Sequence, residues 1–202
     1  HTTGNAHSNP KRRLMKDGPT NEAASRGAPA TKLDALFRPA SIAFVGGSNL
    51  AAALRYHREQ GFAGRTFVVS PKYETIEGFA CTPSLGDVPE AVDLAFVGVG
   101  RHAAVSVIAQ LRDLGCKAVI CNAAGFLETG DAGLQAALTD AAGDMALLGP
   151  NSIGLVNFLD PLAAVMDHFG CARPASGVAI VSQGGGFLCD CVFADRGLAV
   201  TH

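Results

Sequence analysis

The sequence lacks tryptophan, and it also lacks a large excess of charge and any long hydrophobic run. Its 16 Lys and Arg residues nearly balance its 18 Asp and Glu residues, which gives a formal net charge of -2. This balance excludes broad electrostatic binding to nucleic acid or to an anionic membrane surface. No apolar stretch reaches the ~18 residues of a membrane-spanning helix, because Gly, Asp or Arg interrupts each one. We therefore expect neither nucleic acid nor a membrane as a partner.

We expect no signal peptide, and the sequence also lacks any cluster with metal-binding spacing. It has six cysteines, but no Cys-x-x-Cys motif and no His/Cys group spaced like zinc ligands. A chain of 202 residues with 48% hydrophobic residues does not need a disulfide framework to form a core. We expect reduced thiols, a cytoplasmic location and no metal.

What the sequence does contain is an alternation of short apolar runs with helical patterns. Residues 1–31 are polar and aperiodic, and they are predicted to form a disordered or tag-derived tail. Five strands are expected after the tail, at Ser41 to Val45, Thr66 to Val69, Leu94 to Val99, Ala118 to Cys121 and Met145 to Leu148. Three helices are expected between them, each followed by glycine, at Leu50 to Gln60, Ala103 to Leu114 and Ala132 to Ala142. This order predicts an α/β fold, a Rossmann-like doubly wound parallel sheet over residues 32–157.

A second, incomplete α/β unit of flavodoxin-like type is expected near the C-terminal end. Residues 158–176 are interpreted as a turn-rich linker, and residues 177–202 supply a strand, a helix over Phe187 to Asp195 and the start of another strand. Between the first strand and the helix stand Ser182, Gln183, Gly184, Gly185 and Gly186. A glycine-rich helix start binds phosphate-like groups through unpaired backbone N–H groups and the positive end of the helix dipole.

Ligands of open parallel sheets bind beyond the carboxyl ends of the strands. The segments that follow the five strands supply the candidate cofactor-binding residues, which are Gly46, Gly47, Ser48, Lys72, Val99, Gly100, Ala124, Gly125, Asn151 and Ser152. Because all five carboxyl ends meet at one edge of the sheet, these residues are predicted to form one ligand-binding rim.

Lys72 is the most informative residue of this rim. An acidic residue in its place would bind the ribose 2′-hydroxyl of NAD, whereas a cation favours a phosphorylated ribose. The structural alternative is that Lys72 is only a solvated loop residue. The Gly46-Gly47 pair is not followed by a G-x-G-x-x-G pattern, so it is either a phosphate-binding turn or an ordinary tight turn. An NAD(P)-binding Rossmann protein is therefore the weaker alternative.

Several other polar residues have both a functional and a structural interpretation. Asn151 either contacts ligand or holds its turn, and Glu128 either orients a ligand hydroxyl or lies near the next helix start. His102 and His168 are interpreted as surface, capping or structural residues. His57 is predicted to lie on the solvent face of the first helix. We assign no catalytic residue within the chain.

An ordered set of short motifs extends over most of the sequence. The set is Leu36-Phe37, Pro39, Ser41-Ile42, Val45-Gly46, Gly61-Phe62, Gly64, Pro71-Lys72, Ser84-Leu85, Asp87, Pro89, Val92-Asp93-Leu94-Ala95, Gly125-Phe126, Glu128, Gly130, Leu148-Gly149-Pro150-Asn151-Ser152, Gly154, Val181-Ser182-Gln183 and Gly185. In this order the motifs resemble the NDP-forming (ADP-forming) acyl-CoA synthetases, relatives of the succinyl-CoA synthetase alpha subunit. The resemblance covers residues 32–202.

The resemblance implies a CoA-binding domain over residues 32–157 and the start of a CoA-ligase domain at residue 177. It implies that CoA lies across the rim with its phosphorylated ribose at Lys72, and that the helix start at Ser182, Gln183, Gly184 and Gly185 contacts a phosphohistidine. An ATP-grasp domain or subunit beyond residue 202 would bind ATP or ADP and Mg. The full protein would make acyl-CoA from a carboxylic acid, CoA and ATP through acyl phosphate, and this chain alone is expected to be inactive.

The sequence departs from the family pattern at three places. The loop after Asn49 is shorter than usual or lacks residues, Gly100 replaces a proline, and Gly184-Gly185-Gly186 replaces a less glycine-rich run. No histidine of the chain matches the phosphorylated one. The alternative to a ligase is a CoA or acyl-CoA sensing domain of the kind fused to lysine acetyltransferases. The sequence leaves open which acid is used and whether the chain forms a homo-oligomer.

Overall fold

The computed structural model describes residues 29–170, 173–193 and 197–202. Its centre is a seven-stranded sheet with the strand order β3-β4-β2-β1-β5-β6-β7. The strands are β1 (Ser41–Val45), β2 (Arg65–Val69), β3 (Thr75–Ile76), β4 (Phe79–Thr82), β5 (Leu94–Val97), β6 (Ala118–Cys121) and β7 (Ala146–Leu148). Every neighbouring pair is parallel except β3 with β4. The predicted Rossmann-like α/β fold is confirmed, and the chain order reverses between β1 and β5, where such folds bind their ligands.

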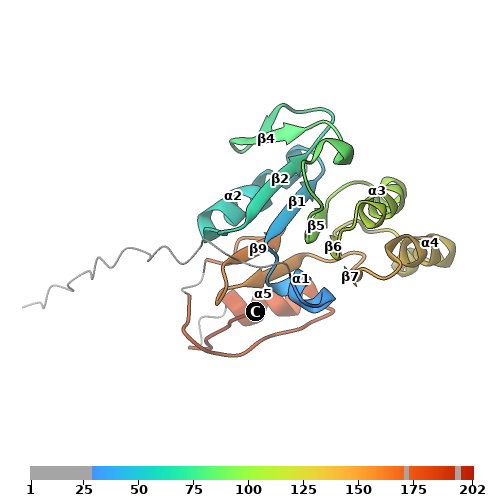
Figure 1. Cartoon of the computed structure of the whole chain (residues 1–202). Helices are drawn as coiled ribbons and strands as arrows, with labels where there is room; N and C mark the ends of the chain where they lie inside the picture. Colours follow the sequence, from blue (N-terminus) through green and yellow to red (C-terminus); the bar gives the residue numbers. More distant parts are fainter. Residues whose placement is uncertain (1–28, 171–172, 194–196) are drawn as a thin grey trace, which may run out of the picture.

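Helices cover both faces of the sheet, with α2 on one face and α3 and α4 on the other (Figure 1). The helices are α1 (Lys32–Phe37), α2 (Ala51–Gln60), α3 (Arg101–Asp113), α4 (Ala132–Ala142) and α5 (Gly185–Phe193). Glycine in the left-handed conformation ends α2 at Gly61, where φ is 68°. Thr31 caps α1 by accepting the N–H of Asp34. The tail predicted over residues 1–31 is therefore wrong at its C-terminal end, and its residues 1–28 lie outside the described residues.

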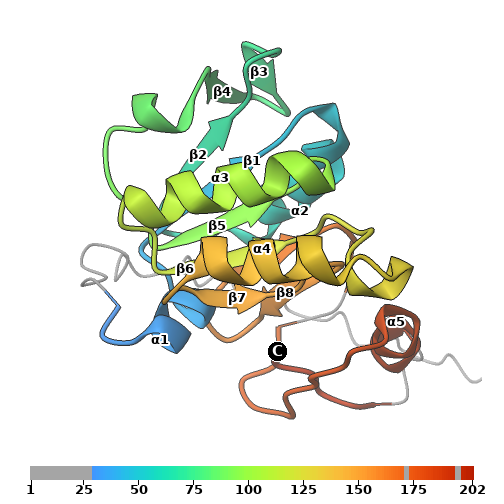
Figure 2. The same cartoon turned by 90° about the vertical axis from the view of Figure 1, so that its right-hand side faces the viewer.

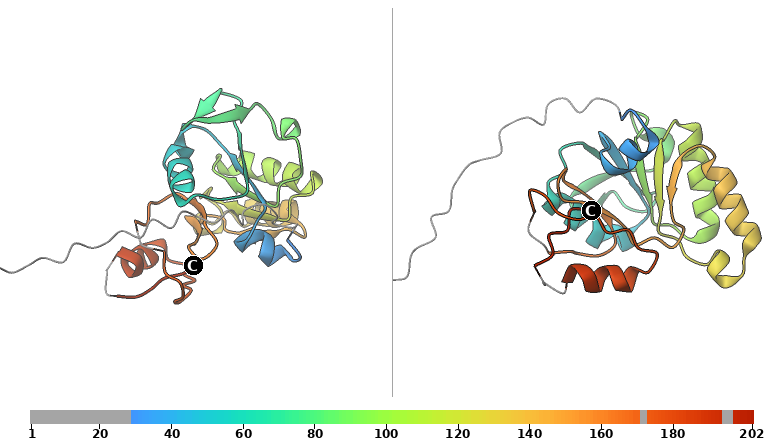
Figure 3. Two further views of the ribbon diagram at one scale, coloured as in Figure 1. Left: turned by 60° about the vertical axis from the view of Figure 1, so that its left-hand side comes forward. Right: turned by 90° about the horizontal axis from the view of Figure 1, so that it is seen from below.

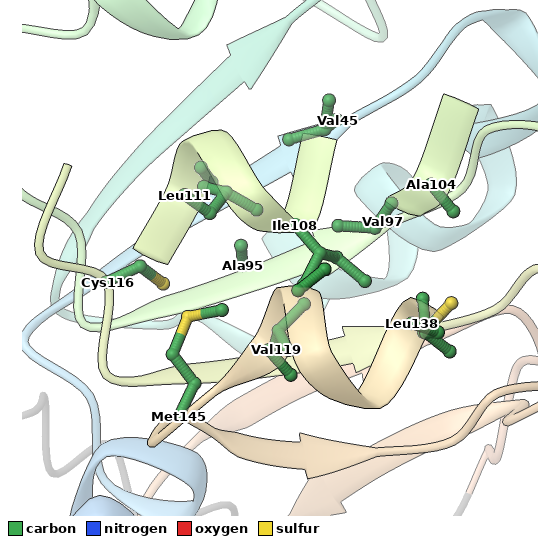
Figure 4. Packing of buried hydrophobic residues seen from close by; sticks show 14 of the residues in the cluster. Val45, Ala95, Val97, Ala104, Ile108, Leu111, Cys116, Val119, Leu138 and Met145 are labelled. Carbon is green, nitrogen blue, oxygen red and sulfur yellow. The ribbon is translucent and has the colours of Figure 1, made fainter. Parts of the chain in front are cut away.

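Buried apolar side chains hold the central strands between two helical layers. All residues of β1, β5 and β6 are buried, as expected for parallel strands covered on both faces. Figure 4 shows Val97 and Val119 of the sheet facing Ile108 of α3 and Leu138 of α4. This packing fixes the strand ends from which the rim loops project.

The sheet has two strands more than the five predicted. A short hairpin, β3 and β4, fills the second crossover, and its turn has positive φ at Glu77 (50°) and Gly78 (80°). β4 then joins the sheet beside β2. Strands of only two and four residues carry too little periodicity to be detected from sequence.

A second hairpin lies on the α2 side of the sheet. It consists of β8 (Gly154–Asn157) and β9 (Leu162–Val165), which pair antiparallel. All four β9 residues are buried, so the linker expected over residues 158–176 contains a buried strand. β9 contacts α2 and buries His57, which is only 1% exposed. The prediction of a solvent-facing His57 is wrong, because β9 covers that side of the helix.

The C-terminal segment contains α5 and one isolated parallel bridge. Val178 pairs parallel with Val200, and α5 lies between them in sequence. The helix begins two residues before the predicted Phe187, while the expected end at Asp195 lies outside the described residues. Figure 2 shows α5 below the sheet, and both views of Figure 3 place it on the side that carries α2. No described residue of α5 is buried, whereas Val200 and Thr201 of the same segment are buried.

Candidate functional site

A cleft of about 780 Å³ lies at the topological switch point, beyond the carboxyl ends of β1, β2 and β5. Six of the ten predicted rim residues line it together, namely Gly46, Gly47, Ser48, Lys72, Val99 and Gly100. This volume lies within the range of small-molecule sites. The structure therefore brings the first half of the predicted rim together at the place that the fold favours for a ligand.

The first glycine turn forms one wall of the cleft and has no room for a side chain at Gly46. A Cβ there would lie 2.8 Å from Cδ1 of Leu50 and 3.0 Å from the carbonyl oxygen of Gly98. Asn49 fixes the turn to β5: its Oδ1 accepts the N–H of Gly47 at 3.1 Å and its Nδ2 donates to Gly98 at 2.9 Å. The turn thus packs as bare backbone against Leu50 and Gly98, and it forms this wall of the cleft.

Lys72 lies exposed at the end of β2 beside Tyr73, and both residues line the cleft. The hydroxyl of Tyr73 donates to Oγ of Ser48 at 3.1 Å, across the glycine turn. Sequence reasoning missed Tyr73 and Asn49. The sequence indicates these two residues only as neighbours of predicted site residues, since Tyr73 follows Lys72 and Asn49 follows Ser48.

The far end of the cleft is formed by residues that do not follow the five predicted strands. They are Pro83, Ser84 and Leu85 after β4, and Val107 and Gln110 on α3. Leu85 is buried and Val107 packs against the core, so this end has an apolar floor. Because β4 was not recognisable in the sequence, neither were the residues that follow it.

The predicted residues Ala124 and Gly125 lie outside the residues that line this cleft. Their loop is held from both sides: the guanidinium of Arg101 donates to the carbonyl of Gly125, and Glu128 accepts the N–H groups of Gly125 and Phe126 at 2.6 and 3.1 Å. The N–H of Gly125 is the main cause that holds the pKa of Glu128 below its ordinary value. Glu128 thus closes its own loop.

Asn151 and Ser152 line a second cavity of about 400 Å³ together with Ser182, Gln183 and Gly185. Hydrogen bonds join their turn to the β6 loop: Asn151 N–H donates to Ala123 at 2.8 Å, and Asn122 Nδ2 donates to the carbonyl of Ser152 at 2.9 Å. Gly184, the remaining residue of the predicted phosphohistidine contact, donates its N–H to Oγ of Ser182 at 3.1 Å. The predicted rim is therefore divided between two cavities.

The histidines of the described residues have structural partners or lie at the surface. His57 Nδ1 is 2.7 Å from the carbonyl oxygen of Ala163, and its Nε2 is 3.0 Å from Oγ1 of Thr66. Burial lowers the pKa of His57 to about 4 despite the bond to Ala163, so it is neutral at pH 7. His168 Nε2 lies 2.9 Å from Glu59, and His102 is exposed at the start of α3.

Two further searches concern metals and membranes. Among residues 29–170, 173–193 and 197–202, no three His, Cys, Asp or Glu side chains come together as metal ligands would. Within the same ranges, no helix combines the length and the apolar character that crossing a membrane requires.

Comparison with known proteins gives a family match and several relatives. Residues 40–157 match the family model described as CoA binding domain. A trans-feruloyl-CoA synthase from an unknown prokaryotic organism is 31% identical over 166 residues, which are 76% of this chain and 24% of that protein. The alpha subunit of the Pyrococcus furiosus ADP-forming acetate–CoA ligase II is 30% identical over 161 residues, which are 76% of this chain and 35% of the subunit.

Among solved structures, the apo form of the dinucleotide-forming acetyl-coenzyme A synthetase 1 of Ca. Korarchaeum cryptofilum superposes with a TM-score of 0.76 at 27% identity. The match covers 84% of this chain and 38% of that one. The chain thus spans between about a quarter and two fifths of the proteins it resembles.

Proposed function

Because this chain belongs to the CoA-binding domain family, we propose that it binds CoA in the switch-point cleft, as the CoA-binding portion of an ADP-forming acyl-CoA synthetase. The observation that carries the proposal is the cleft itself, where bare glycine backbone and a lysine meet beyond β1, β2 and β5. The names of the relatives, a feruloyl-CoA synthase and an acetate–CoA ligase, support a ligase as the full protein.

Lys72 is the residue that we assign to the 3′-phosphate of CoA. It lies after β2, where dinucleotide-binding folds contact the ribose, and its exposed ammonium group is free to meet a phosphate dianion. Ser48 and Tyr73 offer hydroxyl groups on the same wall. The apolar floor around Leu85 suits the face of the adenine base.

The rest of the reaction would belong to other parts of the full protein. We propose that residues 177–202 begin a CoA-ligase domain whose helix start, at Ser182 and Gly185, contacts a phosphohistidine. An ATP-grasp domain or subunit would bind ATP or ADP and Mg. One relative is the alpha subunit of a ligase. This supports an arrangement in which the ATP-grasp part is a separate partner chain.

Isothermal titration calorimetry with CoA and dephospho-CoA tests the assignment of Lys72. Loss of a charge-assisted contact costs about 1.5 to 3 kcal/mol, so Lys72→Ala should weaken CoA binding by roughly tenfold or more. The same variant should bind dephospho-CoA as the unmodified chain does, since that ligand has no 3′-phosphate.

Lys32→Ala is the matched control, because Lys32 is an exposed lysine of α1 that does not line the cleft. It should leave both affinities unchanged. Equal binding of CoA and dephospho-CoA to the unmodified chain would overturn the role of Lys72, and absence of CoA binding would overturn the proposed function.

A further inference from the structure

The second cavity lies between the β8–β9 hairpin and the C-terminal segment, and its walls are mostly apolar. Ile153 and Leu155 line it from the hairpin side, and Leu188 and Val192 line it from α5. Val165 and Phe169, both buried, complete that apolar surface. Its volume of about 400 Å³ is that of a small-molecule site, many times the space of an acetyl group.

Four of the polar residues that line this cavity come from two turns, and His202 lines it as well. Asn151 and Ser152 belong to the loop after β7, and Ser182 and Gln183 belong to the turn before α5. Gly185 touches Ile153, since a Cβ on this glycine would lie 3.3 Å from Cγ2 of Ile153. The two turns therefore lie side by side, and we call Asn151, Ser152, Ser182 and Gln183 the polar mouth of the cavity.

The polar mouth and the switch-point cleft lie at the same edge of the sheet. β5 borders the cleft and β7 precedes Asn151, and only β6 separates these two strands. Two strand spacings amount to about 10 Å. The pantetheine arm of a CoA molecule bound in the cleft is a flexible chain longer than this, so its thiol can reach the mouth of the second cavity.

We propose that the second cavity holds the acyl group of an acyl-CoA, and that this group has an apolar tail of about five carbons or more. The inference rests on the proposed CoA site. The thioester lies at the mouth near Asn151 and Ser182, and the tail lies among Ile153, Leu155 and Leu188. Apolar walls recognise a hydrocarbon or aromatic tail by removing it from water.

Titration of the chain with CoA, acetyl-CoA and hexanoyl-CoA tests the proposal. Hexanoyl-CoA carries four methylene groups more than acetyl-CoA, and their burial should tighten binding about tenfold or more. Acetyl-CoA should bind like CoA. Equal affinities for acetyl-CoA and hexanoyl-CoA would refute the acyl site while leaving the CoA site standing.

A cavity-filling variant links the effect to this cavity. Ala179 is exposed and lines the cavity, so Ala179→Phe should remove the preference for hexanoyl-CoA and leave the affinity for CoA itself unchanged. Val178→Phe is the matched control, because the neighbouring Val178 does not line the cavity. A preference that survives in Ala179→Phe would place the acyl group elsewhere and overturn the proposal.

A second ligand separates the two proposals if CoA itself does not bind. Chemical shifts of the cavity amides, above all Ile153 and Leu188, should move on addition of free hexanoate and should not move in Ala179→Phe. This response without CoA binding would support the apolar site and refute the proposed function. If the chain responds neither to CoA nor to hexanoate, both proposals are refuted.

Discussion

Replacing Gly46 with alanine should destabilise the protein, because the added methyl group has nowhere to go. A Cβ at this position lies 2.8 Å from Cδ1 of Leu50 and 3.0 Å from the carbonyl oxygen of Gly98. Leu50 is fully buried, and a Cβ on Gly98 would in turn lie 2.5 Å from its Cδ2. The Leu50 side chain thus packs directly against both Gly46 and Gly98, and it has no space into which it can move. Overpacking of this kind costs about 1 to 3 kcal/mol.

Urea unfolding of the single and double variants measures this effect. Gly46→Ala should lower the free energy of unfolding by about 1 to 3 kcal/mol, and Leu50→Ala should lower it by about 2 to 5 kcal/mol through the cavity that it leaves. In the double variant the new methyl group enters that cavity. The double variant should therefore be destabilised by about 1 to 2 kcal/mol less than the sum of the two single variants.

Gly100→Ala serves as the control, since a Cβ at Gly100 meets no atom within 4 Å. Gly100 is the N-cap of α3, so the cost of a poorer cap opposes the gain from a stiffer unfolded chain, and the free energy of unfolding should change by less than about 1 kcal/mol. A fully stable Gly46→Ala variant, or strictly additive losses in the double variant, would show that the turn has more room than the structure gives it.

Two further predictions concern buried titratable groups. The pKa of His57 in the folded protein, about 4, lies below its ordinary value of 6.5, so the unfolded chain binds the proton first as the pH falls. His57 should therefore contribute its full stability above pH 6.5 and lose about 3 kcal/mol between pH 6.5 and 4. His57→Gln should lack this loss, so in pH-dependent denaturation the difference in the free energy of unfolding between wild type and variant should fall over this range. Burial raises the pKa of Cys116 and Cys121 to about 11, so neither thiol should react with iodoacetamide at pH 8 until the protein unfolds. Mass spectrometry of the peptides measures this, and alkylation of Cys116 or Cys121 in the folded protein would refute the prediction.

The centre of the sheet was predictable because β1, β5 and β6 are buried on both faces. Continuous apolar runs such as Leu94–Val97 and Ala118–Cys121 stand out between helices that end in glycine, and the observed strands lie within about two residues of the predicted ones. The hairpin β8–β9 was not predictable in this way. The hairpin packs over α2 through contacts such as that of His57 with Ala163, and these two residues are 106 positions apart in the sequence.

The candidate site was predictable to the extent that it follows strand ends. The carboxyl-end rule located Gly46, Lys72 and Gly100, which line one cleft. It could not separate them from Asn151, because the division into two cavities depends on where β8 and the C-terminal segment pack. Residues that reach the cleft from a helix side, such as Gln110, follow no strand and leave no signal in the sequence.

The most direct test of the central claim is an NMR titration of the chain with CoA that follows assigned backbone amides. The account predicts that the largest chemical-shift changes occur at Gly47, Ser48, Tyr73 and Gly100, around the switch-point cleft. They should saturate with the same dissociation constant that calorimetry gives. Shifts confined to other parts of the chain, or no shifts at saturating CoA, would contradict the account.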